Sequence, residues 1–138
     1  MMIRHIAWLV AAVMVSGCAT YSPEEIASLD YGPYPTNYKE IIQSRLNGTL
    51  KDPMSAQIEY RAGPKQVWQK GSIITQKTYG WGVCLWLNAK NSFGAYVGRR
   101  PLSFIIRNGA IVDAHGEMET NMFDTGLANA MCNQVGAT

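Results

Sequence analysis

The chain has 138 residues, and its 12 Lys and Arg against 10 Asp and Glu give a formal net charge of only +2 at pH 7. This length suits one domain with a core of its own. Because the basic residues form neither a run nor a cluster, we expect no nucleic-acid partner and no adhesion to anionic lipid by charge alone.

The first residues have the pattern of an export signal. Arg4 and His5 precede an uninterrupted apolar run over 6–15, which is shorter than the roughly 20 residues that a membrane-spanning helix needs. The run ends in Val15-Ser16-Gly17-Cys18, which resembles the lipobox of bacterial lipoproteins. The resemblance implies cleavage before Cys18, a diacylglycerol thioether on its sulfur and an acyl chain such as palmitate on its new amino group. The alternative is an ordinary cleaved signal with a stray cysteine.

These patterns divide the chain into a signal peptide over 1–17, a lipidated tether with a short helix over 18–36, and a single domain over 37–138. Ala19 follows the cysteine where an Asp would favour retention in the inner membrane. We therefore expect an outer-membrane lipoprotein that faces the periplasm, with the membrane itself as its first partner through the acyl chains.

Two cysteines remain after lipidation, Cys84 and Cys132. In the oxidising periplasm, two thiols in one small exported domain are expected to form a disulfide. The alternative is two separately buried free thiols. Because the sequence has no C-x-x-C motif and no Cys/His cluster, neither a redox motif nor a zinc site is predicted, and we expect no metal and no cofactor.

Helix signals dominate the first half of the mature chain. Ser22-Pro23-Glu24-Glu25 is a capping-box pattern with Pro at the first helical position, and it predicts a short helix. A second capping-box pattern begins at Asn37, and apolar residues at helical spacing predict a helix over 37–50. One further helical turn is expected at Asp52-Pro53. An alternating strand over 57–61 should end at 63–64, and 65–78 is either a ragged second strand or an ordered loop.

The segment 79–107 predicts two long strands that meet at a polar turn over 91–94. If the residues of the two strands are paired outward from that turn, apolar residues lie opposite one another on one face: Trp81 with Phe104, Val83 with Leu102, and Ala89 with Tyr96. Asn108-Gly109 then predicts a type I′ turn into another strand, with both faces of the sheet covered at this end. A last helix is expected over 121–134. The order predicts an α+β domain, an antiparallel meander of about four strands flanked by an N-terminal and a C-terminal helix.

Residues suited to catalysis are few. His115, the one histidine of the mature chain, lies between Asp113 and Glu117, so a carboxylate–histidine pair is conceivable. A hydroxyl nucleophile such as Ser103 or Ser92 would have to come from elsewhere, and no G-x-S-x-G elbow is present. We prefer a solvated loop histidine and assign no catalytic residue. Three metal ligands from this one short loop would be incomplete, and Glu119 and Asp124 suggest no acid–base pair.

The turn region of the predicted hairpin is the better candidate for binding, because it gathers polar donors beside aromatic rings. The alternative is that Asn91 and Ser92 only serve the turn backbone, that Phe93 covers the core and that Lys90 is solvated. Arg99 is expected to stack on Trp86 across the strands. The candidate binding residues are Asn88, Lys90, Asn91, Ser92, Tyr96 and Arg99.

The run from Asn88 to Gly98, together with Leu50-Lys51-Asp52-Pro53-x-Ser55-Ala56, resembles a family of small exported bacterial proteins and lipoproteins with the pattern "LkDPxSA … VNAKNSFGGYxGxxPF". The resemblance covers about 38–112 and implies common ancestry without a known activity. This chain departs from the pattern at Ala95 and at Arg99-Arg100.

We therefore expect a non-enzymatic, membrane-tethered periplasmic lipoprotein. It would bind an envelope protein or glycan through the 88–100 hairpin end or an exposed sheet edge. Two alternatives stay open: a small cell-envelope hydrolase that uses His115 with Asp113, and a structural accessory subunit of a secretion or assembly complex.

Overall fold

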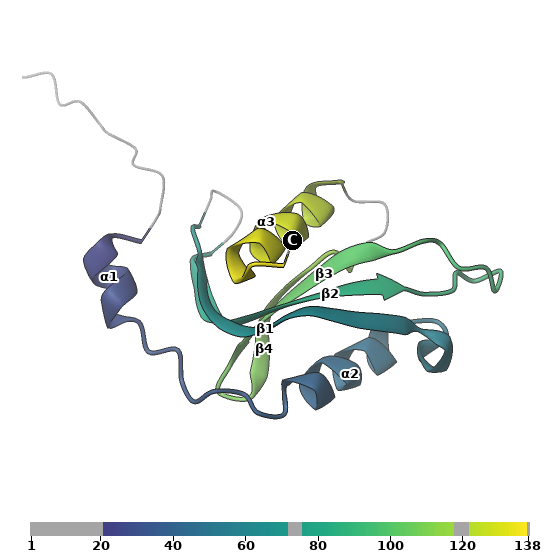
Figure 1. Cartoon of the computed structure of the whole chain (residues 1–138), viewed down its shortest axis with the longest axis horizontal. Coiled ribbons are helices and arrows are strands. Elements are labelled where there is room, and N and C mark those ends of the chain that lie inside the picture. The colour runs from purple at the N-terminus through teal and green to yellow at the C-terminus, as the bar shows by residue number, and fades with distance from the viewer. Residues whose placement is uncertain (1–20, 72–75, 118–121, 138) are drawn as a thin grey trace, which may run out of the picture.

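Four antiparallel strands form one open sheet in the order β1-β2-β3-β4 (Figure 1). The computed structural model describes residues 21–71, 76–117 and 122–137, so the lipobox lies outside the described residues. The elements are α1 (Pro23–Ser28), α2 (Tyr38–Thr49), the 3₁₀ turn η1 (Pro53–Ser55), β1 (Gln57–Gln69), β2 (Thr78–Asn88), β3 (Arg100–Arg107), β4 (Ala110–His115) and α3 (Met122–Val135). The predicted α+β meander with one helix at either end of the domain is confirmed.

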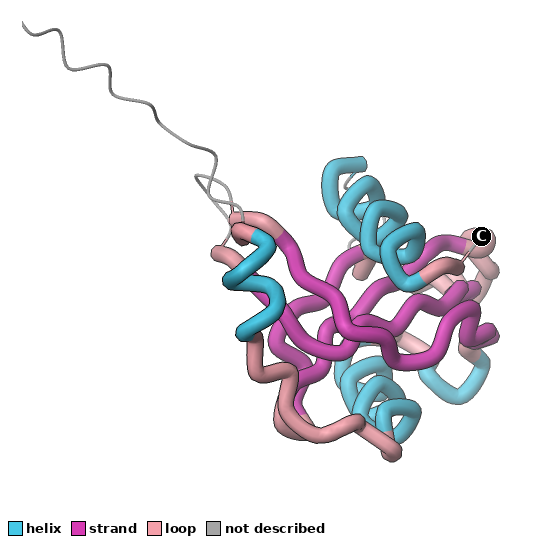
Figure 2. The backbone as a smooth tube through the Cα atoms, turned by 60° about the vertical axis from the view of Figure 1, so that its left-hand side comes forward, coloured by secondary structure: helices cyan, strands magenta, loops and turns pink. Residues whose placement is uncertain are grey.

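The sheet lies between two helices, with α2 on one face and α3 on the other (Figure 2). Successive residues of a strand point to opposite faces, so β3 contributes Leu102, Phe104 and Ile106 to the α2 side and Ile105 to the α3 side. This explains why both faces of β3 are apolar, as its sequence predicted. From the helices, Ile42 and Leu46 fill the first core, and Met131 and Val135 fill the second.

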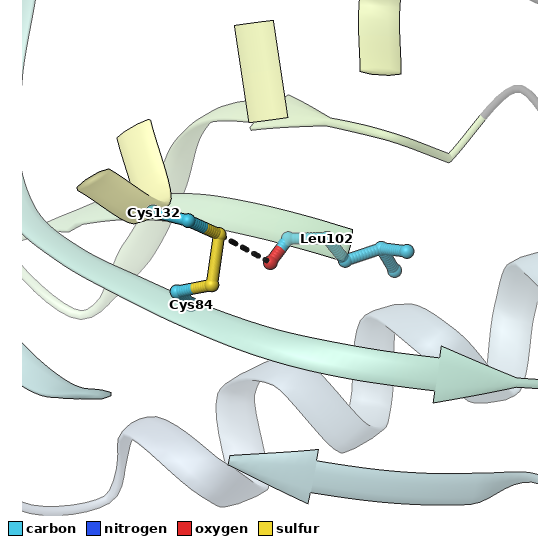
Figure 3. Close-up of a disulfide and its surroundings, with 3 residues drawn as sticks. All are labelled: Cys84, Leu102 and Cys132. Carbon is cyan, nitrogen blue, oxygen red and sulfur yellow. Dashed lines mark hydrogen bonds between the residues drawn. A yellow bond between two sulfur atoms is a disulfide. The ribbon is translucent and has the colours of Figure 1, made fainter. Parts of the chain in front are cut away.

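Cys84 of β2 and Cys132 of α3 form a disulfide across the α3 side of the sheet (Figure 3). The Sγ atom of Cys132 lies 4.0 Å from the carbonyl oxygen of Leu102. This is a packing contact, because a disulfide sulfur carries no hydrogen to donate. The predicted disulfide therefore joins the last helix to the middle of the sheet.

The pairing of β2 with β3 differs from the prediction by two residues. Val83 lies opposite Phe104, and Leu85 lies opposite Leu102. The predicted turn is present, since the N–H of Gly94 donates to the carbonyl of Asn91 at 3.0 Å. Two one-residue bulges follow it, at Gly94 (φ 80°) and at Gly98 (φ 99°). Because two slips of one residue add to an even number, Trp81, Val83, Leu102 and Phe104 keep a common face although their predicted pairs are wrong. The predicted pair of Ala89 with Tyr96 is also wrong, since only one slip precedes it and Tyr96 lies opposite Lys90.

β1 is longer than predicted, because Gly63-Pro64 does not end it. Its pairing with β2 shifts between Tyr60 and Ala62 and again between Ala62 and Lys65, and these bulges accommodate the proline, which an edge strand tolerates. The segment 65–69 is therefore strand, whereas 72–75 lies outside the described residues. The β3–β4 turn is type I′ as predicted, with Asn108 at φ 53° and Gly109 at φ 77°.

The two helix starts differ in how they are capped. Ser22 and Glu25 form the predicted capping box of α1, with Pro23 at its first position. Asn37 precedes α2 as predicted but makes no side-chain capping bond. Among the described residues, no helix is long and apolar enough to cross a membrane.

The segment before α2 packs on the domain. Tyr21 contacts Trp68 and Tyr79 edge to face, with ring centroids 6.0 and 6.1 Å apart. Trp81 donates its indole N–H to the carbonyl of Gly32 at 3.2 Å. The chain from Tyr21 onward is therefore part of the folded body and not a loose tether.

Candidate functional site

The amide side chains of the 88–100 hairpin end hold its backbone in shape. The Oδ1 atom of Asn91 accepts hydrogen bonds from the N–H groups of Phe93 at 2.9 Å and Ala95 at 3.1 Å. Asn88 accepts from the N–H of Gly98 at 3.0 Å and donates to Gln57 at 3.0 Å. The interpretation in which Asn91 serves the turn is confirmed, and the same holds for Asn88.

The cations and Tyr96 of the hairpin end contact neighbouring elements. Lys90 lies 3.7 Å from the carboxylate of Asp52 and 5.5 Å from the ring centroid of Tyr96. The hydroxyl of Tyr96 donates to the carbonyl of Ser55 at 2.9 Å, which fixes η1 against the hairpin. These predicted binding residues therefore serve internal contacts.

Arg99 forms an ion pair with Glu59, and its guanidinium lies 5.7 Å from the ring centroid of Trp86. The predicted stacking is present, although Trp86 pairs with Pro101 in the observed register. Hydrogen bonding from Arg61, helped by the charge of Arg99, lowers the pKa of the Glu59 carboxyl below its ordinary value. The ion pair is exposed, so its contribution to stability is small.

The apolar residues at this end of the molecule remain uncovered. Phe93 is 95% exposed, so it is not a cover for the core as the sequence alternative proposed, and Met54 of the adjoining η1 is 93% exposed. Tyr96 and Val97 are also exposed. Behind them lies a small pocket of about 230 Å³, whose lining includes Leu50, Ala89 and Ser92.

His115 is buried and not solvated, which corrects the sequence interpretation. It is 9% exposed at the end of β4. Its Nε2 atom lies 3.2 Å from Asp113 and 3.2 Å from the carboxamide oxygen of Gln69 in β1, and its Nδ1 atom lies 3.4 Å from Asp124 in α3. Asp124 also accepts the N–H of Gly116 at 2.9 Å. Asp124 therefore contacts both the His115 ring and the backbone that follows it.

The two carboxylates favour the protonated imidazolium. Hydrogen bonding to Asp113 is the largest cause that raises the pKa of His115 above its ordinary value of 6.5, and Asp124 adds to it while burial opposes it. In the protonated form, each ring N–H donates to a carboxylate. The imidazolium thus joins three separate elements, β1, β4 and α3.

Gln69, Asp113 and His115 line a cavity, which we name the α3 cleft. Its volume is about 850 Å³, and it lies between α3, the end of β4 and the ends of β1 and β2 that face them. Apolar side chains make much of its wall: Trp68, Val112, Phe123, Leu127, Ala130 and Met131. Its polar lining residues are Gln69, Lys70, Gln76, Thr78, Asp113, His115 and Gln134. An apolar concave surface with a few converging polar groups is the usual form of a ligand site.

The arrangement around His115 does not resemble a nucleophile activated by a base. Both of its ring nitrogens face acceptors. The hydroxyl of Ser103, opposite His115 in the sheet, is buried and has no hydrogen-bond partner among the described residues. Glu117 forms a bidentate pair with Arg45 of α2, at 3.0 and 2.8 Å, instead of joining Asp113 and His115. In the described part of the chain, no group of three or more His, Cys, Asp or Glu residues is arranged to hold a metal ion.

Sequence reasoning found Asp113 and His115 as a pair but missed the cleft around them. Residues two apart on a strand share a face, so that contact could be found from spacing alone. Gln69 and Phe123 reach the same cleft from other elements, and no local pattern shows this.

Comparison with known proteins adds no relative: no family model, no curated protein and no solved structure matches this chain.

Proposed function

We propose that this chain is a non-enzymatic lipoprotein, anchored in the outer membrane by acyl chains on Cys18 and facing the periplasm. It serves as a binding or accessory module that contacts an envelope protein through the tip of the 88–100 hairpin. The observation that carries the proposal is Phe93, a large apolar side chain that is 95% exposed on a turn braced by internal hydrogen bonds.

A protein fits this surface better than a glycan. The Oδ1 atoms of Asn88 and Asn91 and the hydroxyl proton of Tyr96 are already used within the chain, which leaves fewer polar groups to recognise a sugar. The uncovered groups are aromatic and aliphatic, and side chains such as Phe93 and Met54 supply the buried centre of protein interfaces.

The location of the tip also supports the proposal. Figure 1 shows α1, which follows the proposed anchor, at one end of the long axis and the β2–β3 hairpin tip at the other. An acylated N-terminus would hold the α1 end at the membrane, and the hairpin tip would then point toward the periplasm.

In-cell photocrosslinking tests the contact. A photoreactive residue placed at Ser92, which is exposed in the turn, should give a discrete protein adduct, and Phe93→Ala should remove that adduct. Because Phe93 is 95% exposed, this substitution should change the free energy of unfolding by less than about 0.5 kcal/mol. Phe93 is chosen over Lys90, Asn91 and Tyr96 because those three side chains hold the hairpin in place.

Met122→Ala is the matched control, since Met122 is 89% exposed but lies at the start of α3. It should leave the adduct unchanged. No protein adduct from position 92, or equal loss with both variants, would refute the proposed contact surface. An adduct that lysozyme digestion releases would indicate a glycan instead.

The anchor has a separate test. Cys18→Ser should abolish acylation and move the protein from the membrane fraction to the soluble periplasm, as fractionation and mass measurement would show. Retention of the variant in the membrane fraction would contradict the lipoprotein assignment.

A further inference from the structure

Asp113 gives the α3 cleft a carboxylate acceptor, while donors such as Lys70 and Gln134 line other parts of it. If His115 is protonated, both of its ring N–H groups are directed to Asp113 and Asp124, so they are not available to a ligand. Asp113 keeps part of its carboxylate open to solvent and lines the cleft, and each carboxylate oxygen accepts more than one hydrogen bond. A ligand that enters the cleft therefore needs a donor group at this point.

The charges in the cleft favour a cationic donor. Asp113, which lines the cleft, and Asp124, which contacts His115 from behind that lining, together carry two negative charges against the single charge of the imidazolium. Lys70, also in the lining, is exposed to solvent, where water screens its charge. An anion bound at Asp113 would face this surplus of carboxylate with no N–H of His115 free to receive it, whereas a cation there would balance the remaining negative charge.

The remaining wall of the cleft suits an apolar body attached to that cation. Phe123 is 61% exposed and lies on the cleft with Trp68, Leu127 and Met131. Aromatic faces attract ammonium groups as well as apolar groups, and a volume of about 850 Å³ is ample for a small organic molecule.

We propose that the α3 cleft is a binding site for a small organic cation, with its ammonium group hydrogen-bonded to Asp113 and its apolar body packed against Phe123 and Trp68. This site is separate from the hairpin tip: it lies between α3 and β4, and the hairpin contact can fail without affecting it.

Three probes of similar size and different charge test the proposal on the full folded domain: 2-phenylethylammonium, 2-phenylethanol and 3-phenylpropanoate. Titrations followed by amide chemical shifts should show that the ammonium binds most tightly and the carboxylate least. The shifts should concentrate on Gln69, Asp113 and the first two turns of α3. Asp113→Asn, which keeps the shape of the side chain, should weaken ammonium binding about 10- to 100-fold through the loss of one charged hydrogen bond. It should leave 2-phenylethanol binding unchanged.

Glu40→Gln is the matched charge control, because Glu40 is an exposed carboxylate on α2, across the sheet from the cleft. It should leave all three affinities unchanged. Phe123→Ala removes an exposed ring and should weaken both the ammonium and the alcohol, which supplies a second test if Asp113→Asn does not fold. The proposal is overturned if the carboxylate binds as tightly as the ammonium, or if the shifts lie outside the cleft. It is also overturned if Phe123→Ala and a folded Asp113→Asn protein both keep full ammonium affinity.

Discussion

Removing the Cys84–Cys132 disulfide should destabilise the domain by about 4 kcal/mol, a figure that follows from chain entropy. The bond closes a loop with a sequence separation of 48 residues. The loss of unfolded-state entropy, about 2.1 + 1.5R ln n cal/mol/K, then gives roughly 4 kcal/mol at 25 °C. Small domains have a total stability of about 5–15 kcal/mol, so the loss is a large part of the whole.

Two perturbations separate the crosslink from the packing of the sulfur atoms. Reduction of the wild-type protein breaks the bond but keeps both sulfurs in the core, where Cys84 and Cys132 are buried. The double variant Cys84→Ala/Cys132→Ala removes the sulfur volume as well and adds a void on the α3 side of the sheet. The double variant should therefore be less stable than the reduced wild type.

Urea denaturation followed by tryptophan fluorescence measures both effects. The oxidised protein should unfold at a higher urea concentration than the reduced protein, and reductant should not affect the double variant. A difference below about 1 kcal/mol between oxidised and reduced wild type would refute the chain-entropy reasoning.

Three further predictions use the same denaturation assay. Phe104→Ala, at a side chain with no exposed surface, should cost about 3–5 kcal/mol, and a cost near zero would show that the core is not packed as described. Gly48→Ala should stabilise α2 by up to about 1 kcal/mol, because nothing lies within 4 Å of the added methyl group. Gly109→Ala should instead cost about 1–2 kcal/mol, because its φ is 77°; effects of equal sign would contradict the assigned backbone. The free energy of unfolding should fall as the pH rises above 6.5, the ordinary pKa of His115, because the folded-state pKa is higher and the stabilising proton is lost as the pH passes through it. His115→Gln should lack this slope, and an unchanged slope would exclude the His115 contacts as its cause.

The elements of the fold could be predicted because their signals are local. Asn108-Gly109 specified its turn through two residues, and Ser22 with Glu25 specified a helix start within one turn of chain. The register of β2 with β3 was missed because Gly94 and Gly98 each insert a residue into the ladder. A glycine signals the freedom to bulge, but whether the strand bulges there depends on packing across the sheet.

The candidate sites were less predictable for the same physical reason. The amides of Asn88 and Asn91 are as consistent with binding as with bracing a turn until their partners are known. His115 was placed in a loop because its flanking glycine and charges suggest solvent. Its burial comes from Gln69, 46 residues away, and from α3, which the disulfide fixes over the sheet.

The packing of Tyr21 on Trp68 and Tyr79 has a consequence for how the protein would move at a membrane. With Cys18 acylated as proposed, only Ala19 and Thr20 separate the lipid from the folded body. Three extended residue steps span at most about 10 Å. A domain held this closely has little freedom to tumble or to move away from the membrane surface into the periplasm. It would diffuse within the plane of the membrane, and the length of the domain, not that of its linker, would set the height at which it meets other molecules.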